Sequence, residues 1–138
     1  MPGTAKILVV DDDPDIIQAI QIVLESQDYE VLTAVNGEEG LERVKRDKPD
    51  ALVLDLLMPK KDGFAVLREL KEDPRMAKLP ILVLTSVREE ASRRRYQLET
   101  GIELNVDDYV EKPIAPVDLI NRIANLVRKS KPAIPTSG

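Results

Sequence analysis

The residues best suited to chemistry in this sequence are polar side chains that directly follow apolar runs. Asp11 and Asp12 come after the first run, Asp55 after the third, Thr85 after the fourth and Lys112 after the fifth. Because the carboxyl ends of parallel strands meet at one edge of a sheet, we expect these side chains to surround a single crevice.

Carboxylates crowded into such a crevice repel one another, and a hard divalent cation such as Mg²⁺ relieves that repulsion. A carboxylate is already ionised at neutral pH, so it can attack phosphorus without a general base and form an acyl phosphate. The ammonium of Lys112 and the hydroxyl of Thr85 are suited to compensating the charge of a transferred phosphoryl group. The pattern therefore predicts magnesium-dependent phosphoryl chemistry.

The composition excludes several other kinds of chemistry. The 138 residues include no cysteine and no histidine, which rules out disulfides, thiolate zinc sites and the commonest general base. The net charge of −5 argues against direct binding to nucleic acid, which needs a basic surface. No apolar run is long enough to span a membrane or to form a signal peptide, so we expect a cytoplasmic protein.

Apolar runs alternate with helical patterns along the whole chain, which is typical of βα units around a parallel sheet. Two helices carry clear start signals. Asp13 precedes Pro14 as a candidate N-cap, and Asn36 has Glu39 at the capping-box position. Strands are predicted at about 5–10, 30–35, 51–54, 81–84 and 108–111, and helices at about 14–27, 37–48, 64–73 and 87–100. A last helix is predicted from the spacing of Ile120, Ile123, Ala124 and Val127.

Five strands and five helices predict a doubly wound α/β sandwich, with ligands at the carboxyl ends of the strands. The length suits one domain. We expect that domain to occupy residues 1–129, with 130–138 as a disordered tail or linker stub.

Four segments of the sequence resemble the motifs of response regulator receiver domains, in the usual order. They are ILVVDDDPDI, VLDLLMPKKDG, VLTS and DDYVEKP. The resemblance covers about residues 5–129. It implies a flavodoxin-like sheet of strand order 2-1-3-4-5 and a commonly cis bond between Lys112 and Pro113.

The resemblance also implies a role for each polar residue at the crevice. Asp55 is expected to accept a phosphoryl group, Asp12 to bind Mg²⁺ directly and Asp11 to support that ion. The carbonyl of Leu57 is expected to be a further metal ligand. Lys112, with Thr85, is expected to contact the phosphoryl group.

Receiver domains switch through an aromatic residue, and Tyr109 stands at its place in this sequence. The resemblance implies that it moves inward as the Thr85 hydroxyl turns toward the phosphoryl group. The expected partners are a sensor histidine kinase or a phosphotransfer protein and an unknown downstream protein, and the expected state is a monomer or weak dimer. The segment between Thr85 and Lys112 is longer than the family usually has.

Two other functions remain open from the sequence. One is a docking module that is never phosphorylated, against which the complete set of polar residues argues. The other is a magnesium-dependent phosphohydrolase that forms an aspartyl phosphate. Such enzymes usually have a second aspartate two positions after the nucleophile, where this chain has Leu57.

Overall fold

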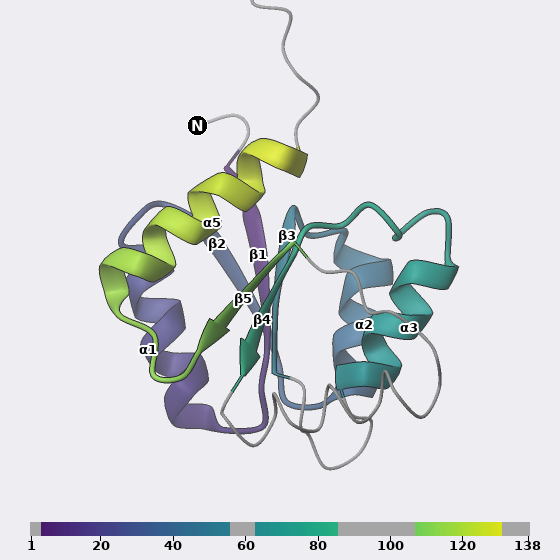
Figure 1. The fold of residues 1–138 in the computed structure, drawn as a ribbon, viewed down its shortest axis with the longest axis horizontal. Coiled ribbons are helices and arrows are strands. Elements are labelled where there is room, and N and C mark those ends of the chain that lie inside the picture. The colour runs from purple at the N-terminus through teal and green to yellow at the C-terminus, as the bar shows by residue number, and fades with distance from the viewer. Residues whose placement is uncertain (1–3, 56–62, 86–106, 131–138) are drawn as a thin grey trace, which may run out of the picture.

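The computed structural model describes residues 4–55, 63–85 and 107–130, and they form a parallel sheet between two layers of helices (Figure 1). The strand order is β2-β1-β3-β4-β5, which confirms the predicted topology. The strands are β1 (Lys6–Val10), β2 (Glu30–Ala34), β3 (Ala51–Asp55), β4 (Ile81–Thr85) and β5 (Asp108–Glu111).

Four helices are present in the described residues, and their labels follow Figure 1. They are α1 (Pro14–Glu25), α2 (Gly37–Asp47), α3 (Gly63–Glu72) and α5 (Pro116–Ser130). Helices α1 and α5 cover one face of the sheet, and α2 and α3 cover the other (Figure 1). The helix predicted at 87–100 lies outside the described residues. None of the described helices is long and apolar enough to cross a membrane.

The two predicted helix caps are confirmed. Asp13 accepts a hydrogen bond from the backbone N–H of Asp15 at 2.9 Å, and Asn36 accepts one from that of Glu39 at 2.9 Å. The Glu39 carboxylate accepts in turn from the backbone N–H of Val35 at 3.4 Å. These bonds satisfy amide donors that have no partner within a first helical turn.

The core consists of two apolar clusters, one on each face of the sheet. Every residue of β3 is buried, as expected for a central strand covered by helices on both sides. In α1, Ile17, Ile20 and Leu24 are buried, whereas Ile16 is partly buried and packs against the same core cluster. The i, i+3, i+7 spacing of the buried three places Ile16 at the border of the apolar stripe.

The register of the sheet brings the ends of the strands together. Val10 pairs with Leu54, so Asp11 and Asp55 follow at the same level of neighbouring strands. Thr85 pairs with Glu111, the residue before Lys112. Because a shift of one residue would turn each side chain to the opposite face, this register determines which groups meet at the carboxyl edge.

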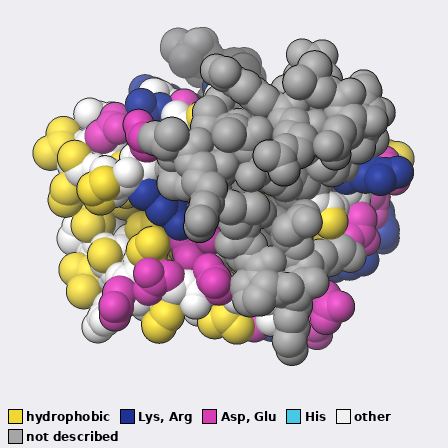
Figure 2. Space-filling view, turned by 60° about the horizontal axis from the view of Figure 1, so that its bottom comes forward, with side chains coloured by type: hydrophobic (Ala, Val, Ile, Leu, Met, Phe, Trp, Pro, Cys, Tyr) yellow, Lys and Arg dark blue, Asp and Glu magenta, His cyan; other side chains and the backbone are white. Residues whose placement is uncertain are grey.

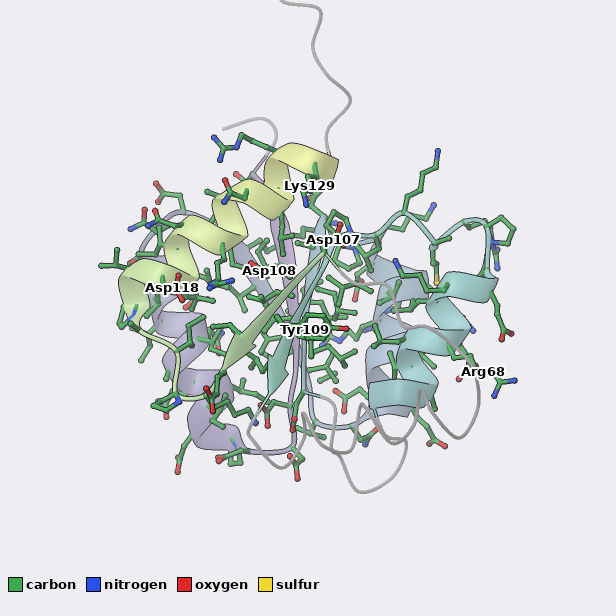
Figure 3. The ribbon with its side chains drawn as sticks, viewed as in Figure 1. Arg68, Asp107, Asp108, Tyr109, Asp118 and Lys129 are labelled. Carbon is green, nitrogen blue, oxygen red and sulfur yellow. The ribbon has the colours of Figure 1, made fainter. Side chains whose placement is uncertain are left out.

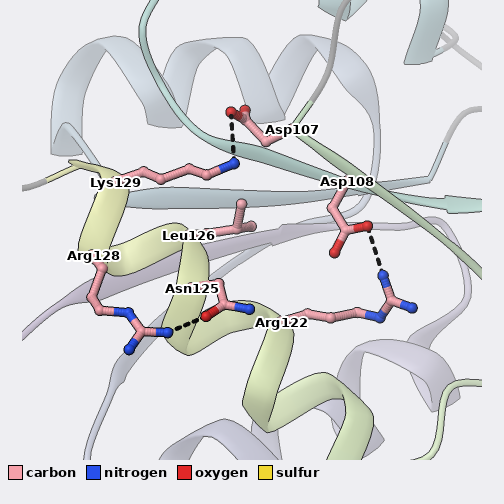
Figure 4. A pocket seen from close by; sticks show the side chains of 7 residues that line it. All are labelled: Asp107, Asp108, Arg122, Asn125, Leu126, Arg128 and Lys129. Carbon is pink, nitrogen blue, oxygen red and sulfur yellow. Dashed lines mark hydrogen bonds and ion pairs between the residues drawn. The ribbon is translucent and has the colours of Figure 1, made fainter.

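A single arginine attaches α5 to β5. Arg122 donates to the Asp108 carboxylate at 2.6 Å (Figure 4). The same guanidinium donates to the Asp118 carboxylate at 3.0 Å. It also donates to the carbonyl of Tyr109 at 3.3 Å. Asp108 and Tyr109 belong to β5 and Asp118 to α5, as Figure 3 shows. The guanidinium thus fixes the strand that leads to Lys112.

Helix α2 approaches β1 closely at Gly40. A Cβ at this position would lie 2.9 Å from Cγ2 and 3.2 Å from Cγ1 of Val10, which is fully buried. Val10 is β-branched and cannot turn away easily, so the helix depends on the missing side chain.

We predict that Gly40→Ala lowers the free energy of unfolding by about 1–3 kcal/mol, because overpacking against Val10 outweighs the higher helix propensity of alanine. Urea unfolding measures the change. Glu42→Ala, at an exposed position of the same helix, is the control, and Val10→Ala in the Gly40→Ala background should recover part of the loss. A Gly40→Ala protein as stable as the parent would show that the approach is not tight.

Candidate functional site

Three carboxylates meet at the carboxyl edge of the sheet. Asp11, Asp12 and Asp55 each place an oxygen so that these oxygens lie within 4.8 Å of one another. Asp11 is 0% exposed and Asp55 is 2% exposed, whereas Asp12 is exposed at the rim. Acidic side chains gather beside cationic ones at this end of the molecule (Figure 2). The convergence predicted from the strand ends is confirmed for these three residues.

Lys112 lies between the two buried carboxylates. Its Nζ is 3.3 Å from Oδ2 of Asp11 and 3.5 Å from Oδ1 of Asp55. The side chain is 21% exposed, so the ammonium is partly withdrawn from water and its attraction for the carboxylates is only partly screened. One positive charge therefore offsets part of the negative charge of this group.

The two oxygens of Asp11 have different surroundings. Oδ1 accepts a hydrogen bond from the backbone N–H of Asp13 at 2.9 Å. Oδ2 is buried, and its one nearby cation among the described residues is the Lys112 ammonium, which forms an ion pair with it at 3.3 Å rather than a well-formed hydrogen bond. A buried acceptor without a hydrogen bond is costly, and a bound cation removes that cost.

Burial raises the pKa of Asp11 from 3.8 to about 6. The negative charge of Asp55 raises this pKa further, while the N–H of Asp13 and the ammonium of Lys112 lower it. At neutral pH the carboxylate is ionised in an environment that disfavours its charge. The acidic group is therefore suited to hold a metal ion, whose charge favours the ionised form.

The other predicted site residues are described only in part. The backbone of Thr85 ends β4 beside Glu111, and the placement of its side chain is outside the description, as is Leu57 altogether. Tyr109 is partly buried and packs against the apolar cluster on the α2 and α3 face of the sheet. The bond between Lys112 and Pro113 is cis, as the resemblance implied.

Two contributions to the site could not be predicted from the sequence. One is the N–H of Asp13, which holds Asp11 while the Asp13 side chain caps α1. The other is Arg122, which fixes β5. A backbone donor leaves no trace in the sequence, and an arginine on an amphipathic helix usually lies in water.

This chain belongs to the response regulator receiver domain family, whose sequence profile matches residues 7–124. It is therefore a two-component receiver domain, a signalling phosphoacceptor, with an acidic pocket formed by Asp11, Asp12 and Asp55.

Two curated relatives illustrate the likeness in sequence. The chain is 41% identical over 132 residues to the alkaline phosphatase synthesis transcriptional regulatory protein PhoP of Bacillus subtilis, a match that covers 96% of this chain and 52% of the relative. It is 43% identical over 127 residues to the response regulator MprA of Mycobacterium leprae, a match that covers 92% of this chain and 53% of the relative. The chain thus spans about half the length of these relatives.

Solved structures show the same fold. A putative response regulator from Chloroflexus aurantiacus superposes with a TM-score of 0.80 at 32% identity, covering 91% of this chain and 99% of the other. The chemotaxis response regulator CheY4 of Vibrio cholerae superposes with a TM-score of 0.77 at 26% identity, covering 90% of this chain and 99% of the other.

We predict that Asp11→Asn stabilises the metal-free protein at neutral pH by about 1–3 kcal/mol, because it removes a disfavoured buried charge and retains an acceptor for the N–H of Asp13. Since the pKa of Asp11 is about 6 in the folded protein and 3.8 in the unfolded chain, the ionised carboxylate lowers stability above pH 6. That cost shrinks as the pH falls from 6 to 3.8.

The check is urea unfolding in the presence of chelator at about pH 7.5 and about pH 4, on either side of the folded pKa. The stability gain of Asp11→Asn should be largest at the higher pH and nearly absent at the lower one. A variant that is less stable than the parent at both pH values would contradict this electrostatic account.

Proposed function

We propose that Asp55 accepts a phosphoryl group from a histidine of a sensor kinase or phosphotransfer protein. The observation that carries this proposal is the placement of Asp55 at the end of β3, nearly buried, with its Oδ1 3.5 Å from the Lys112 ammonium. Asp11 and Asp12 complete an acidic group beside it. This chain is a receiver domain, and receiver domains as a class take their phosphoryl group from histidine kinases.

The proposed transfer needs few catalytic groups. A carboxylate oxygen of Asp55 attacks the phosphorus, an O–P bond forms as the P–N bond to the histidine breaks, and the released imidazole takes up a proton. The Lys112 ammonium offsets negative charge on the phosphoryl oxygens, and the Thr85 hydroxyl donates to one of them. A carboxylate nucleophile needs no general base, because its attacking oxygen carries no proton that must be removed.

We further propose that Asp12, Asp55 and the carbonyl of Leu57 bind Mg²⁺, with Asp11 supporting the ion. Hard oxygen donors are the ligands that this ion prefers, and the buried Oδ2 of Asp11 has no hydrogen bond from the described residues. When bound, Mg²⁺ supplies positive charge that neutralises the phosphoryl oxygens and the carboxylates together.

The proposed output is a change in the surface around β5. Tyr109 lies on that strand, two residues before Glu111, which pairs with Thr85. An inward movement of the phenol when Thr85 engages the phosphoryl group would alter what a downstream protein or domain contacts. The relative from Bacillus subtilis is named a transcriptional regulatory protein, which supports an output in gene control.

We predict that incubation with Mg²⁺ and phosphoramidate adds one phosphoryl group to the protein and none to Asp55→Ala. Intact-mass spectrometry measures the adduct, and omission of Mg²⁺ with added chelator should abolish it. Asp12→Ala, which leaves the nucleophile in place, is the matched control for loss of the ion. Its adduct should form at least about tenfold more slowly.

Three other outcomes of the same experiment would contradict this proposal. An adduct on Asp55→Ala equal to that on the parent would exclude Asp55 as the acceptor. A folded protein that binds Mg²⁺ but gains no mass would indicate a docking module. Consumption of phosphoramidate over many turnovers without an adduct would indicate a phosphohydrolase.

We predict that the affinity for Mg²⁺ falls as the pH drops below about 6, by up to about tenfold per pH unit, because protons compete with the ion for Asp11. Above about pH 6 the Asp11 carboxylate is ionised, and the affinity for Mg²⁺ should level off. Isothermal titration calorimetry between about pH 8 and pH 5 measures the trend. Constant affinity across this range would mean that Asp11 is ionised throughout or takes no part.

A further inference from the structure

A second cavity lies at the opposite end of the sheet from the acidic pocket. It has a volume of about 800 Å³ and is bordered by the end of α2, the segment after α3 and the residues that precede β3 and β4. The strands point away from it, and the connection from α3 to β4 runs along this end (Figure 1). We call it the basic groove, after the cations that line it: Lys45, Lys48, Arg75, Lys78 and Lys129.

The basic groove is positively charged, whereas the protein as a whole is negatively charged. Five cations and one acid, Asp50, are among its lining residues, although the whole chain has a net charge of −5. Asp50 accepts a hydrogen bond from the backbone N–H of Lys6 at 2.8 Å, so its carboxylate is engaged in structure. A concentrated positive patch on an acidic protein attracts anionic partners selectively.

Three of the cations have no ion-pair partner among the described residues, although Asp73 interacts electrostatically with Lys45. Within residues 4–55, 63–85 and 107–130, no carboxylate forms an ion pair with Lys45, Lys48 or Lys78, and all three side chains are exposed. Arg75 pairs with Asp73 at 3.1 Å. Lys129, which lies at this end of the molecule beside Asp107 (Figure 3), is 3.9 Å from that carboxylate.

The groove also offers apolar surface. Met76 and Leu79 are partly buried and pack against the core cluster that contains Val44. These side chains line the cavity together with Lys45 and Lys48, at the end of α2, and Lys78, after α3. An occupant can therefore bury an apolar side chain while its charges remain near the lysine ammoniums, which extend on flexible stems.

We propose that the basic groove binds an acidic peptide segment of a partner protein, with an apolar side chain of the peptide against Met76 and Leu79. A peptide fits better than a nucleotide or another phosphate ligand. Lysines can bind phosphate, but phosphate sites in proteins usually add backbone N–H groups or a free arginine fork, and here Pro49 and Pro80 have no N–H and Arg75 is held by Asp73. Exposed lysines instead match several carboxylates spaced along a chain.

This binding goes beyond phosphoryl transfer and does not depend on it. Strands of five residues separate the groove from the acidic pocket, which corresponds to roughly 16 Å at the usual rise per residue. A peptide in the groove leaves Asp55 open to a kinase. The groove thus provides a second, constitutive docking surface, and its occupancy should be the same for Asp55→Ala as for the parent protein.

The test is fluorescence anisotropy with a labelled synthetic peptide of about ten residues that contains glutamates and two central leucines. We expect saturable binding that weakens as NaCl rises from about 0.05 M to about 0.5 M, because screening reduces the attraction. Lys45→Gln combined with Lys78→Gln should weaken binding by about tenfold. Arg68→Gln combined with Arg128→Gln removes the same charge from exposed positions outside the groove and should change the affinity less than about twofold.

Two further peptides separate the contributions. Replacing the leucines by serine should weaken binding, and replacing the glutamates by glutamine should abolish it. Equal loss in both double variants would overturn the proposal, because only net charge would then matter. Binding of ATP at the groove without binding of the peptide would also overturn it. So would failure of the peptide to bind the parent protein, once equal urea midpoints for the parent and both double variants show that all three are folded.

Discussion

The placement of Lys112 between Asp11 and Asp55 is the interaction on which the site depends. Two carboxylates that are nearly inaccessible to solvent and close to each other repel strongly, and the lysine ammonium lies 3.3 Å from one and 3.5 Å from the other. The charge balance is incomplete, since the pKa of Asp11 is still raised to about 6. An incomplete balance suits a receiver, because it leaves a site that gains stability when a cation binds.

Other parts of the structure hold these three groups in position. The register of β1 against β3 sets Asp11 level with Asp55, and the close approach of α2 at Gly40 packs Val10 directly before Asp11. Arg122 fixes β5, from which Lys112 follows. Side chains distant from the reacting atoms thus hold the Asp11 and Asp55 carboxylates close together, although their like charges repel. The opposite end of the sheet carries the reverse charge, in the basic groove.

The sequence predicted the sheet and the acidic group because both follow from local patterns. Apolar runs mark the strands, caps such as Asp13 and Asn36 mark the helix starts, and the parallel topology brings strand ends together. The sequence could not predict features that depend on packing between distant segments. The ion pairs of Lys112, the contact at Gly40 and the basic groove each join residues through tertiary structure.

The most direct test of this account is a double-mutant cycle of Lys112→Met and Asp11→Asn, measured by urea unfolding at neutral pH without divalent ions. If Lys112 balances a buried pair of carboxylates, Lys112→Met alone should lower the free energy of unfolding by about 2–4 kcal/mol, because it leaves buried charge uncompensated. Adding Asp11→Asn should recover at least about half of that loss. Strictly additive effects, or a Lys112→Met protein as stable as the parent, would contradict the central role of this lysine.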